Sequence, residues 1–523
     1  MIEIFLTIVW IPYLIFRTKK SLHMLQQNLY DDDFRYVKWI KKNFSKIMLS
    51  FDLSQVLLIF FILFVKKGIA IPILFGIIYL LLFIRSFGLS YKEVVKKPLV
   101  VTPRVKRLIF TIVLIYVLSI YSSFKFNINY YIVLSLLAYL QYFIVFLAVK
   151  INIPIEKCVY LSFKRKAMNK LNSMSNLDVI GITGSYGKTS SKNILNDILN
   201  SKYSTLATPR NLNTPYGLIM TINNDLDKFD ELFIAEMGAY KIGEIKELCD
   251  LVHPKYGILT RIGTAHLELF GSQENVQKGK FELIESLPED GVAVLNKDDE
   301  LQVNYELKNK VKILWIGIDN ECDYRATNIN VSNTGTKFEL QIKGDKKKYK
   351  FETKLLGYAN IYNILAGIAL GHYLGIKIKQ LQSAVKSVKP VEHRLEIKNN
   401  GSVYYIDDAY NSNPVGSKMA LDVLKMMPGK KIIVTPGMIE LGSIEDEENT
   451  KFGEYMADVC DEVILIGDKQ TKAIQKGLEN KKYDKKHIHI LEDVIDAFPL
   501  VNKLKTQETY VLLENDLPDL FKE

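Results

Sequence analysis

The sequence predicts an α-helical membrane domain followed by an α/β part, in which a central domain with a phosphate-binding loop precedes a Rossmann-like domain. Three observations lead to this prediction. Long apolar runs fill the first 150 residues, a glycine-rich loop occupies residues 181–190, and short β-rich runs alternate with helical patterns from residue 178 onward. We expect the domain boundaries at 1–150 (membrane domain), 151–176 (amphipathic linker), 177–395 (central domain) and 396–523 (last domain).

Five apolar runs predict about five membrane-spanning helices, because most are close to the roughly 17–20 residues that a bilayer span needs. The first run has neither a basic start nor a small-residue cleavage site, so we interpret it as a retained span and not as a signal peptide. Asp52, inside the second run, is either a functional intramembrane acid or the mark of a late start near Leu53. The runs are Ile2 to Phe16, Ile47 to Val65, Gly68 to Ile84, Leu108 to Phe124 and Tyr130 to Val149.

The charges between these runs predict their orientation. Residues 17–46 carry eight Lys and Arg and residues 85–107 carry seven, whereas the alternate connections carry only Lys66 with Lys67, and Lys125. Because Lys and Arg accumulate on the cytoplasmic side, we expect a multi-pass plasma-membrane protein with its N-terminus outside and its α/β part in the cytoplasm. Buried helices of a soluble domain are the alternative, and the alternating charge disfavours it.

The net charge of +10 belongs to the membrane part. Residues 1–150 hold 19 Lys and Arg against 6 Asp and Glu, which leaves 49 against 52 for the remainder. The part of the chain after residue 150 therefore has no excess of positive charge, which argues against a nucleic-acid partner. The four cysteines lie far apart with no C-x-x-C pair, which suggests neither a zinc ribbon nor a disulfide framework and suits a reducing cytoplasm.

Residues 181–190 read Gly-Ile-Thr-Gly-Ser-Tyr-Gly-Lys-Thr-Ser, between a β-rich stretch and a helix-like run. We expect the backbone N–H groups from Gly184 through Ser185 and Gly187 to Lys188 to form an anion-binding nest at a helix N-terminus. Lys188 would neutralise phosphate oxygens, and Thr189 or Ser190 would offer a hydroxyl to Mg²⁺. Ile182 stands where the strict motif has its first Gly. By itself the loop predicts binding of a nucleoside triphosphate.

Strand-like runs in two groups predict two α/β domains. A Lys-rich stretch, 336–354, is typical of a hairpin. The first group is 179–183, 232–235, 256–259 and 292–295, and the second is 403–406, 431–435, 463–466, 487–491 and 510–513.

Nine sequence blocks follow the loop, and in this order and spacing the set resembles the Mur ligases, the ATP-dependent amide ligases of cell-wall peptide synthesis. The blocks around Asp407 and Gly437 are most similar to the branch that adds D-alanyl-D-alanine. The resemblance covers about residues 177–523. The blocks are 208–217 (TPRNLNTPYG), 235–238 (AEMG) with 243–245 (GEI), 263–271 (GTAHLELFG), 279–282 (GKFE), 295–299 (LNKDD), 357–363 (GYANIYN), 393–396 (HRLE), 407–414 (DDAYNSNP) and 437–442 (GMIELG).

The resemblance implies ATP and Mg²⁺ as cofactors and an acyl-phosphate mechanism. It implies that Lys188 contacts the phosphates, that Thr189 and Glu236 hold one Mg²⁺ and that His266 helps to hold a second. Lys280 matches a lysine that CO₂ carbamylates in many members. The remaining matches are the nucleotide-contacting positions Asn296, Asn363, Arg394 (near the γ-phosphate) and Asp408 (near the ribose), and the acceptor-side positions Asn211 and Asn213.

Each of these residues, taken singly, also has an ordinary structural interpretation. Glu236 could be a solvated acid at a strand end, His266 a loop histidine, Lys280 a surface lysine and Asn363 an amide on a helix face. Their common register with the blocks favours the functional interpretation, least strongly for Asn211.

The chain departs from the family pattern at three places. Ala359 stands where a nucleotide-contacting His is usual, and Val511 to Asp516 stands near the expected place of a Lys-Gly-Ser signature that helps to position the incoming amine. The usual soluble N-terminal domain that binds the UDP part of the substrate is replaced by the apolar runs.

From these observations we expect a membrane-anchored ATP-dependent ligase that joins an amino acid or dipeptide to a carboxylate of a cell-envelope precursor, with D-alanyl-D-alanine addition in peptidoglycan biosynthesis as the specific prediction. A lipid-linked acceptor, or a poly-γ-glutamate-like or pseudomurein-like polymer, is the first alternative. A membrane scaffold whose degenerate ligase domain only senses nucleotide is the second.

Overall fold

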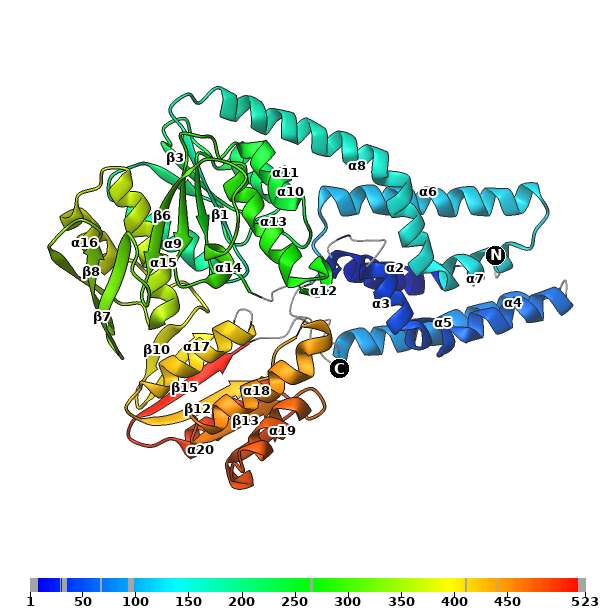
Figure 1. Ribbon diagram of the computed structural model, residues 1–523. Coiled ribbons are helices and arrows are strands. Elements are labelled where there is room, and N and C mark those ends of the chain that lie inside the picture. Colours follow the sequence, from blue (N-terminus) through cyan, green and yellow to red (C-terminus); the bar gives the residue numbers. More distant parts are fainter. Residues whose placement is uncertain are drawn as a thin grey trace. The chain divides into compact units, whose positions relative to one another are not determined.

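The computed structural model describes residues 8–28, 30, 35–65, 68–92, 98–263, 267–409, 412–439 and 441–515. The chain divides into a helical unit, Met1–Ser162, and an α/β unit, Phe163–Leu517 (Figure 1). The helix α8 begins in the first unit and ends at Asn172 in the second, so the segment expected as an amphipathic linker is helical over most of its length.

The helices of the first unit differ in composition: α4, α5 and α7 are mostly apolar, whereas α2, α3 and α8 carry several basic residues. Their bounds are α2 Trp10–Gln27, α3 Val37–Lys42, the π-helix η2 Ser45–Leu49, α4 Leu53–Val65, α5 Ala70–Lys92, α6 Pro103–Lys125, α7 Tyr130–Tyr139 and α8 Gln141–Asn172.

Two of these helices, α5 and α6, are long and apolar enough to cross a bilayer. A third candidate arises if α7 and α8, which are bent by 80° at their junction, form one broken span. The helix α4 has 13 residues, and a rise of about 1.5 Å per residue leaves it shorter than the roughly 30 Å hydrocarbon core. By length and composition the described residues therefore contain two or three candidate spans, and the expectation of five is not supported.

Asp52 is one half of a buried ion pair at the start of α4. Its carboxylate pairs with Arg17 of α2 and also accepts a hydrogen bond from Tyr13. Arg17 Nη2 donates to the backbone oxygens of Ile47 and Tyr139, each at 3.0 Å. Asp52 therefore precedes the helix, as the late-start interpretation predicted. Through Arg17, the ion pair connects α2 with the start of α4 and with the backbone at Ile47 and Tyr139 by charge-assisted hydrogen bonds.

The central domain of the α/β unit is built on a nine-stranded sheet with the order β2-β3-β1-β4-β5-β6-β7-β8-β9. The strands from β2 to β7 pair in parallel, and β7, β8 and β9 pair antiparallel, so the hairpin predicted for 336–354 is confirmed. The strands are β1 Asp178–Thr183, β2 Thr205–Ala207, β3 Leu232–Glu236, β4 Tyr256–Leu259, β5 Val292–Asn296, β6 Lys312–Gly317, β7 Tyr324–Ser332, β8 Gly335–Ile342 and β9 Lys348–Thr353.

Helices cover both faces of this sheet (Figure 1). The helices α9, α15 and α16 share one core with the strands, and α13 packs on the other face, where Leu283 and Leu287 lie over Gly181 and Gly257. Both faces of a parallel sheet must be buried, which explains why its strands are apolar throughout. The helices are α9 Lys188–Leu199, α10 Pro215–Asn224, α11 Glu244–Val252, α12 Leu267–Phe270, α13 Gln273–Glu285, α14 Glu300–Val303, α15 Gly357–Tyr373 and α16 Ile378–Ser387.

The last domain has a six-stranded sheet with the order β10-β11-β15-β12-β13-β14, parallel except for β10. The helices α17, α18 and α19 pack on one face and α20 on the other. The final strand, β15, therefore enters between β11 and β12 from the opposite face, which creates a topological switch point there. The elements are β10 Glu396–Asn400, β11 Val403–Asp408, α17 Pro414–Lys425, β12 Lys430–Thr435, η3 Gly442–Ile444, α18 Glu445–Ala457, β13 Glu462–Ile466, α19 Lys472–Asn480, η4 Lys485–His487, β14 Ile488–Leu491, η5 Val494–Asp496, α20 Ala497–Leu504 and β15 Thr509–Glu514.

Candidate active site

The glycine-rich loop connects β1 to α9 at the carboxyl end of the central sheet, where two glycines are required. Gly184 has φ 150°, and a Cβ at this position would lie 2.0 Å from Thr260 Oγ1. Gly187 has φ 78° and immediately precedes α9. Only glycine adopts both conformations without strain, and this allows the backbone to turn sharply into the helix.

The backbone N–H groups of Ser185 and Tyr186 donate to a protein carbonyl, whereas the sequence led us to expect that the loop amides would be available for an anion. The N–H groups of Ser185 and Tyr186 donate to the Arg261 oxygen at 2.9 and 3.4 Å. The N–H groups at the start of α9 have no intrahelical acceptor, because the acceptors would lie in a preceding turn that does not exist. They are the amides that a phosphate can use, together with the positive end of the helix dipole.

Lys188 is the first residue of α9, and its side chain turns back over the loop. Its Nζ donates to the backbone oxygens of Gly184, at 2.7 Å, and Ser185, at 3.2 Å. Desolvation lowers the pKa of Lys188, and the nearby Glu236 opposes this effect while Arg394 adds to it. Glu236 and Arg394 thus both act electrostatically on Lys188. Ser190, on the same helix, is buried.

Glu236, at the carboxyl end of β3, is buried and contacts three side chains from two other segments. Its Oε1 accepts from Thr189 Oγ1 at 3.1 Å and from Asn213 Nδ2 at 3.0 Å. Its Oε2 lies 3.3 Å from Nζ of Lys192. The solvated-acid interpretation of Glu236 is therefore wrong.

The oxygen donors at this point suit Mg²⁺. A hydroxyl from Thr189 and a carboxylate from Glu236 are hard ligands, and Mg²⁺ is usually held by one or two carboxylates together with substrate phosphates. Among the described residues no group of three or more His, Cys, Asp and Glu could hold a metal, which agrees with such a sparse protein donor set. His266, the other expected metal ligand, lies outside the described residues.

Lys192 belongs to this site, although the sequence analysis assigned it no role. It lies one helical turn after Lys188 on α9, it is 1% exposed, and besides its ion pair it donates to the Arg210 oxygen. The i, i+4 spacing from Lys188 placed it on the same helix face. The sequence around Lys192 is polar and does not indicate that this lysine is buried. Only the tertiary structure shows that it pairs with Glu236.

Lys280 lies on α13 and is buried, so the interpretation as a surface lysine is wrong. Its Nζ donates to the Ala239 oxygen at 3.2 Å and lies 5.2 Å from the centre of the Phe270 ring. Desolvation holds the pKa of Lys280 well below its usual value, and the positive charge of Lys188 lowers it further, against the opposing effect of Glu244 and Glu282. A neutral amine is thus favoured at this position.

The asparagines expected at the site differ in their placement. Asn363, on α15, has its Oδ1 3.4 Å from the point that a Cβ on Gly187 would occupy, so it lies beside the loop. Asn296 ends β5 and accepts from the Asp298 amide at 2.9 Å. Asn213 contacts Glu236, whereas Asn211 is exposed and its backbone oxygen accepts from the Asn213 amide at 2.9 Å.

Arg394 lies in a strained turn between the two domains of the α/β unit. His393 and Leu395, its neighbours on either side, have φ 59° and 50°. This left-handed conformation is costly for residues other than glycine, and it persists only where the surroundings impose it. Asp407 and Asp408 of β11 impose it, since Asp407 Oδ2 lies 2.9 Å from His393 Nδ1 and Asp408 Oδ1 accepts from the Leu395 amide at 3.2 Å.

Glu514, at the end of β15, is a second buried acid that the sequence analysis did not assign. Its Oε1 accepts from the hydroxyls of Ser412, at 2.8 Å, and Ser417, at 2.9 Å. Desolvation raises the pKa of Glu514 well above its usual value, and the carboxyl group of Asp408 raises it further. Desolvation also raises the pKa of Asp408, to about 6, although Arg394 opposes the rise.

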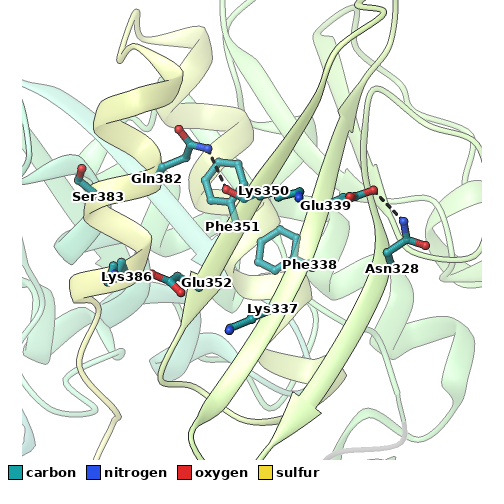
Figure 2. A pocket seen from close by; sticks show the side chains of 10 residues that line it. All are labelled: Asn328, Lys337, Phe338, Glu339, Lys350, Phe351, Glu352, Gln382, Ser383 and Lys386. Atoms are coloured by element: carbon teal, nitrogen blue, oxygen red, sulfur yellow. Dashed lines mark hydrogen bonds and ion pairs between the residues drawn. The ribbon is translucent and has the colours of Figure 1, made fainter.

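A hollow of about 560 Å³ between β8, β9 and α16 contains none of these residues (Figure 2). Phe338 and Phe351 stack at 5.4 Å beneath it, and charged side chains surround it, including the ion pair of Lys386 with Glu352. These charges are solvated and mutually paired, so we assign the hollow no part in the site.

The fold and the site together define a nucleotide-binding ligase with separate P-loop and Rossmann-like domains, and similarity to known proteins gives the family. Residues 182–371 match the model of the Mur ligase middle domain, and residues 393–513 match the Mur ligase, glutamate ligase domain. The chain is 31% identical over 354 residues to the UDP-N-acetylmuramoyl-tripeptide--D-alanyl-D-alanine ligase of Buchnera aphidicola subsp. Acyrthosiphon pisum, covering 66% of this chain and 77% of that protein. The chain belongs to the Mur ligase family.

Two further similarities refine this assignment. The chain is 33% identical over 294 residues to the ligase of the same description from Bacillus subtilis (strain 168), covering 55% of this chain and 62% of that protein. The crystal structure of MurF ligase from Thermotoga maritima in complex with ADP superposes with a TM-score of 0.61 at 27% identity, covering 69% of this chain and 82% of that chain. The chain spans less than two thirds of the length of the Bacillus protein.

The buried Lys192–Glu236 pair gives a prediction about stability. Replacing Lys192 by Met leaves Glu236 buried without its cation, which typically costs about 3 kcal/mol or more of unfolding free energy. We expect K192M to unfold at lower denaturant concentration in detergent solution, and K192M/E236Q to recover most of the loss because the uncompensated charge is removed. Lys246→Met, which breaks the exposed pair with Asp250, is the control and should change little. Equal stability of K192M and the wild type would contradict the pairing.

Proposed function

We propose that the protein is a membrane-anchored, ATP- and Mg²⁺-dependent amide ligase of cell-envelope synthesis, which joins D-alanyl-D-alanine to the carboxylate of a UDP-N-acetylmuramoyl-tripeptide. The observation that carries this proposal is the convergence of Lys188, Glu236 and Arg394 at the phosphate loop. The substrates are those of the relatives with 31% and 33% identity.

The proposed chemistry needs charge neutralisation and alignment more than a covalent protein group. A carboxylate is a poor electrophile, so its phosphorylation by ATP creates an acyl phosphate that an amine can attack. Lys188 and the amides at the start of α9 would hold the phosphates, and Arg394 would stabilise the transferring group. Thr189 and Glu236 would hold Mg²⁺, which supplies further neutralisation of phosphate charge.

We propose that Lys280 acts as a carbamate. Its burial lowers the pKa of Lys280, which makes the ammonium proton easier to lose, and a neutral amine is the form that reacts with CO₂. The product is an anion, which would relieve the repulsion from Lys188 and add negative charge beside the metal-binding groups. Asn296, Asn363 and Asp408 are proposed nucleotide contacts, Asn211 and Asn213 are proposed acceptor contacts, and His266 is a proposed ligand of a second Mg²⁺.

We further propose that the helical unit anchors the ligase in the plasma membrane. Large apolar side chains are exposed along α6, among them Phe110 at 70% and Val117 at 56%, and a lipid surface would cover them. Basic residues cluster in 17–46 and 85–107, which favours a cytoplasmic location for both segments. An anchor in place of a UDP-binding domain also suits a lipid-linked acceptor or a non-muramyl polymer, and product analysis distinguishes these acceptors.

A nucleotide-sensing scaffold with a degenerate ligase domain is the second candidate. It is favoured by Ala359 and by the missing Lys-Gly-Ser signature. The buried Glu236, which Thr189 and Lys192 hold, disfavours it, because a site that has lost its chemistry has no need to maintain a buried charge.

The first test of the ligase function is product formation. We expect the detergent-solubilised protein with ATP, Mg²⁺, UDP-N-acetylmuramoyl-tripeptide and D-alanyl-D-alanine to form the pentapeptide product, detected by mass spectrometry. Lys188→Ala should lower the rate by about 100-fold or more, because it removes a preorganised electrostatic contact to the phosphates. Lys246→Ala, on the exposed face of α11, is the matched control. A folded K188A variant with near-normal turnover would refute the assignment.

The second test concerns the carbamate. Lys280→Ala should be nearly inactive and should regain activity when short-chain carboxylates are added, since these supply the missing negative charge. Lys278→Ala, an exposed lysine on the same helix, should be active without rescue. Full activity of K280A, or no response to carboxylates at any concentration, would exclude the carbamate.

The third test concerns topology. A membrane-impermeant thiol reagent applied to intact cells should label cysteines introduced at Lys66 and Lys125. Both residues lie in connections with few basic residues, which are expected on the outer side of the membrane. A cysteine at Lys97 should react only after permeabilisation. Labelling of Lys97 in intact cells would overturn the proposed orientation. Labelling at Lys42 would show that α4 does not cross and would support three spans.

A further inference from the structure

Arg210 lies in the loop that joins β2 to α10, and its backbone adopts an unfavourable conformation. Its φ is 50°, in the left-handed region that favours glycine. This conformation costs free energy in residues that carry a Cβ. Glycine would make the same turn without that cost, so the presence of arginine indicates that its side chain has a task.

The loop around Arg210 is fixed by groups of the candidate active site. The backbone oxygen of Arg210 accepts a hydrogen bond from Nζ of the buried Lys192, which also pairs with Glu236. Before Arg210, Thr208 Oγ1 accepts from the Glu236 amide at 3.1 Å. After it, Asn213 Nδ2 donates to the Glu236 carboxylate at 3.0 Å. The backbone of Arg210 is therefore held by the residue that is proposed to bind Mg²⁺ and by the partners of that residue.

The side chain of Arg210, in contrast, is available to a ligand. It is exposed, and its guanidinium group makes no hydrogen bond or ion pair with the residues that the structure describes. Lys192 is committed to Glu236 and to the loop, and Lys188 donates to the backbone of the phosphate loop. Simple solvation of the arginine would require no particular backbone conformation. A fixed, strained backbone with a free guanidinium group instead suits the binding of an anion.

The place of Arg210 favours the acceptor over the nucleotide. We expect the nucleotide phosphates at the start of α9, beside Lys188. Arg210 bonds to Lys192, which lies one helical turn, or about 5 Å, further along that helix. In the chain Arg210 directly precedes Asn211 and lies on the same loop as Asn213, and both asparagines are proposed acceptor contacts.

We propose that Arg210 binds an anionic group of the acceptor other than the carboxylate that is phosphorylated, and thereby selects acceptors that carry a second negative charge. This inference rests on the proposed ligase function. The group is a carboxylate or a phosphate, since both accept two parallel hydrogen bonds from a guanidinium group. Because the backbone is already fixed, less conformational freedom is lost when the ligand binds.

The experiment uses Arg210→Gly, which removes the side chain and relieves the strained backbone. We expect R210G to unfold at an equal or higher denaturant concentration than the wild type, because glycine adopts φ 50° without strain. Its KM for UDP-N-acetylmuramoyl-tripeptide should rise by about 10- to 100-fold, the usual effect of losing a hydrogen bond to a charged group. The KM values for ATP and for D-alanyl-D-alanine should stay unchanged. A purely structural role would not combine undiminished stability with this selective loss.

Lys482→Gly is the matched control. Lys482 is also an exposed cation with a left-handed backbone, at φ 55°, but it follows α19 in the last domain. K482G should leave every KM unchanged.

Two truncated acceptors identify the group that Arg210 binds. One lacks the uridine diphosphate, and the other has its non-reacting carboxylates amidated. R210G and the wild type should have equal KM values for the acceptor that lacks the bound group, and should still differ for the other one. A difference that persists with both truncated acceptors would show that Arg210 binds neither group and would overturn the proposal.

Three further outcomes contradict the assignment. An unchanged KM of R210G for the complete acceptor would overturn it, and a rise confined to the KM for ATP would place Arg210 on the nucleotide. Lower stability with equal loss for all three substrates would show a structural role. Wild-type protein that forms no product would refute the ligase function itself, whereas an error in the role of Arg210 leaves product formation by the wild type intact.

Discussion

Side chains from two segments of the central domain hold the Glu236 carboxylate at the end of β3. Thr189 of α9 and Asn213 of the loop before α10 donate to it, and Lys192 of α9 forms an ion pair with it. A charge that is 1% exposed needs such partners, because each unsatisfied bond would cost free energy. The phosphate loop, the helix that follows it and the neighbouring strand are thereby fixed relative to one another. The proposed Mg²⁺ and phosphate contacts depend on this arrangement, since a displacement of about 1 Å is enough to impair such chemistry.

A second constraint connects the two domains of the α/β unit. The left-handed turn at His393 to Leu395 is held by Asp407 and Asp408, and it carries Arg394 into the electrostatic environment of Lys188. Because the turn is held by β11, the position of Arg394 depends on the Rossmann-like domain. The same strand carries Asp408, which lies opposite Glu514 of β15 in the register, so the turn at Arg394 and these two acids share one rigid support.

The helical unit is stabilised by a buried ion pair in apolar surroundings. Arg17 and Asp52 are both less than 10% exposed and exchange hydrogen bonds with Tyr13 and two backbone oxygens. Such a pair is costly to break, because removal of either residue leaves the charge of the other one buried and unpaired. Asp52 lies immediately before α4, so the apolar run around it is interrupted there and α4 is shorter than the run predicted.

The sequence by itself determined the elements whose signal is local. The phosphate loop with the role expected of Lys188, the parallel strands and the hairpin at 336–354 follow from residue types and spacing, whereas the role expected of Glu236 follows from the resemblance to the Mur ligases. The structure places Thr189 against Glu236 and Asn363 beside the loop. The strand β2 is short and β10 is polar, so neither gives a strand signal in the sequence. The apolar strand β6 was also not predicted. Tertiary structure decided that Lys192, Lys280 and Glu514 are buried, that Arg261 binds the first loop amides, and that the last apolar run bends by 80°. Burial and pairing depend on segments far apart in the chain, and a single sequence does not show which of its polar residues will meet.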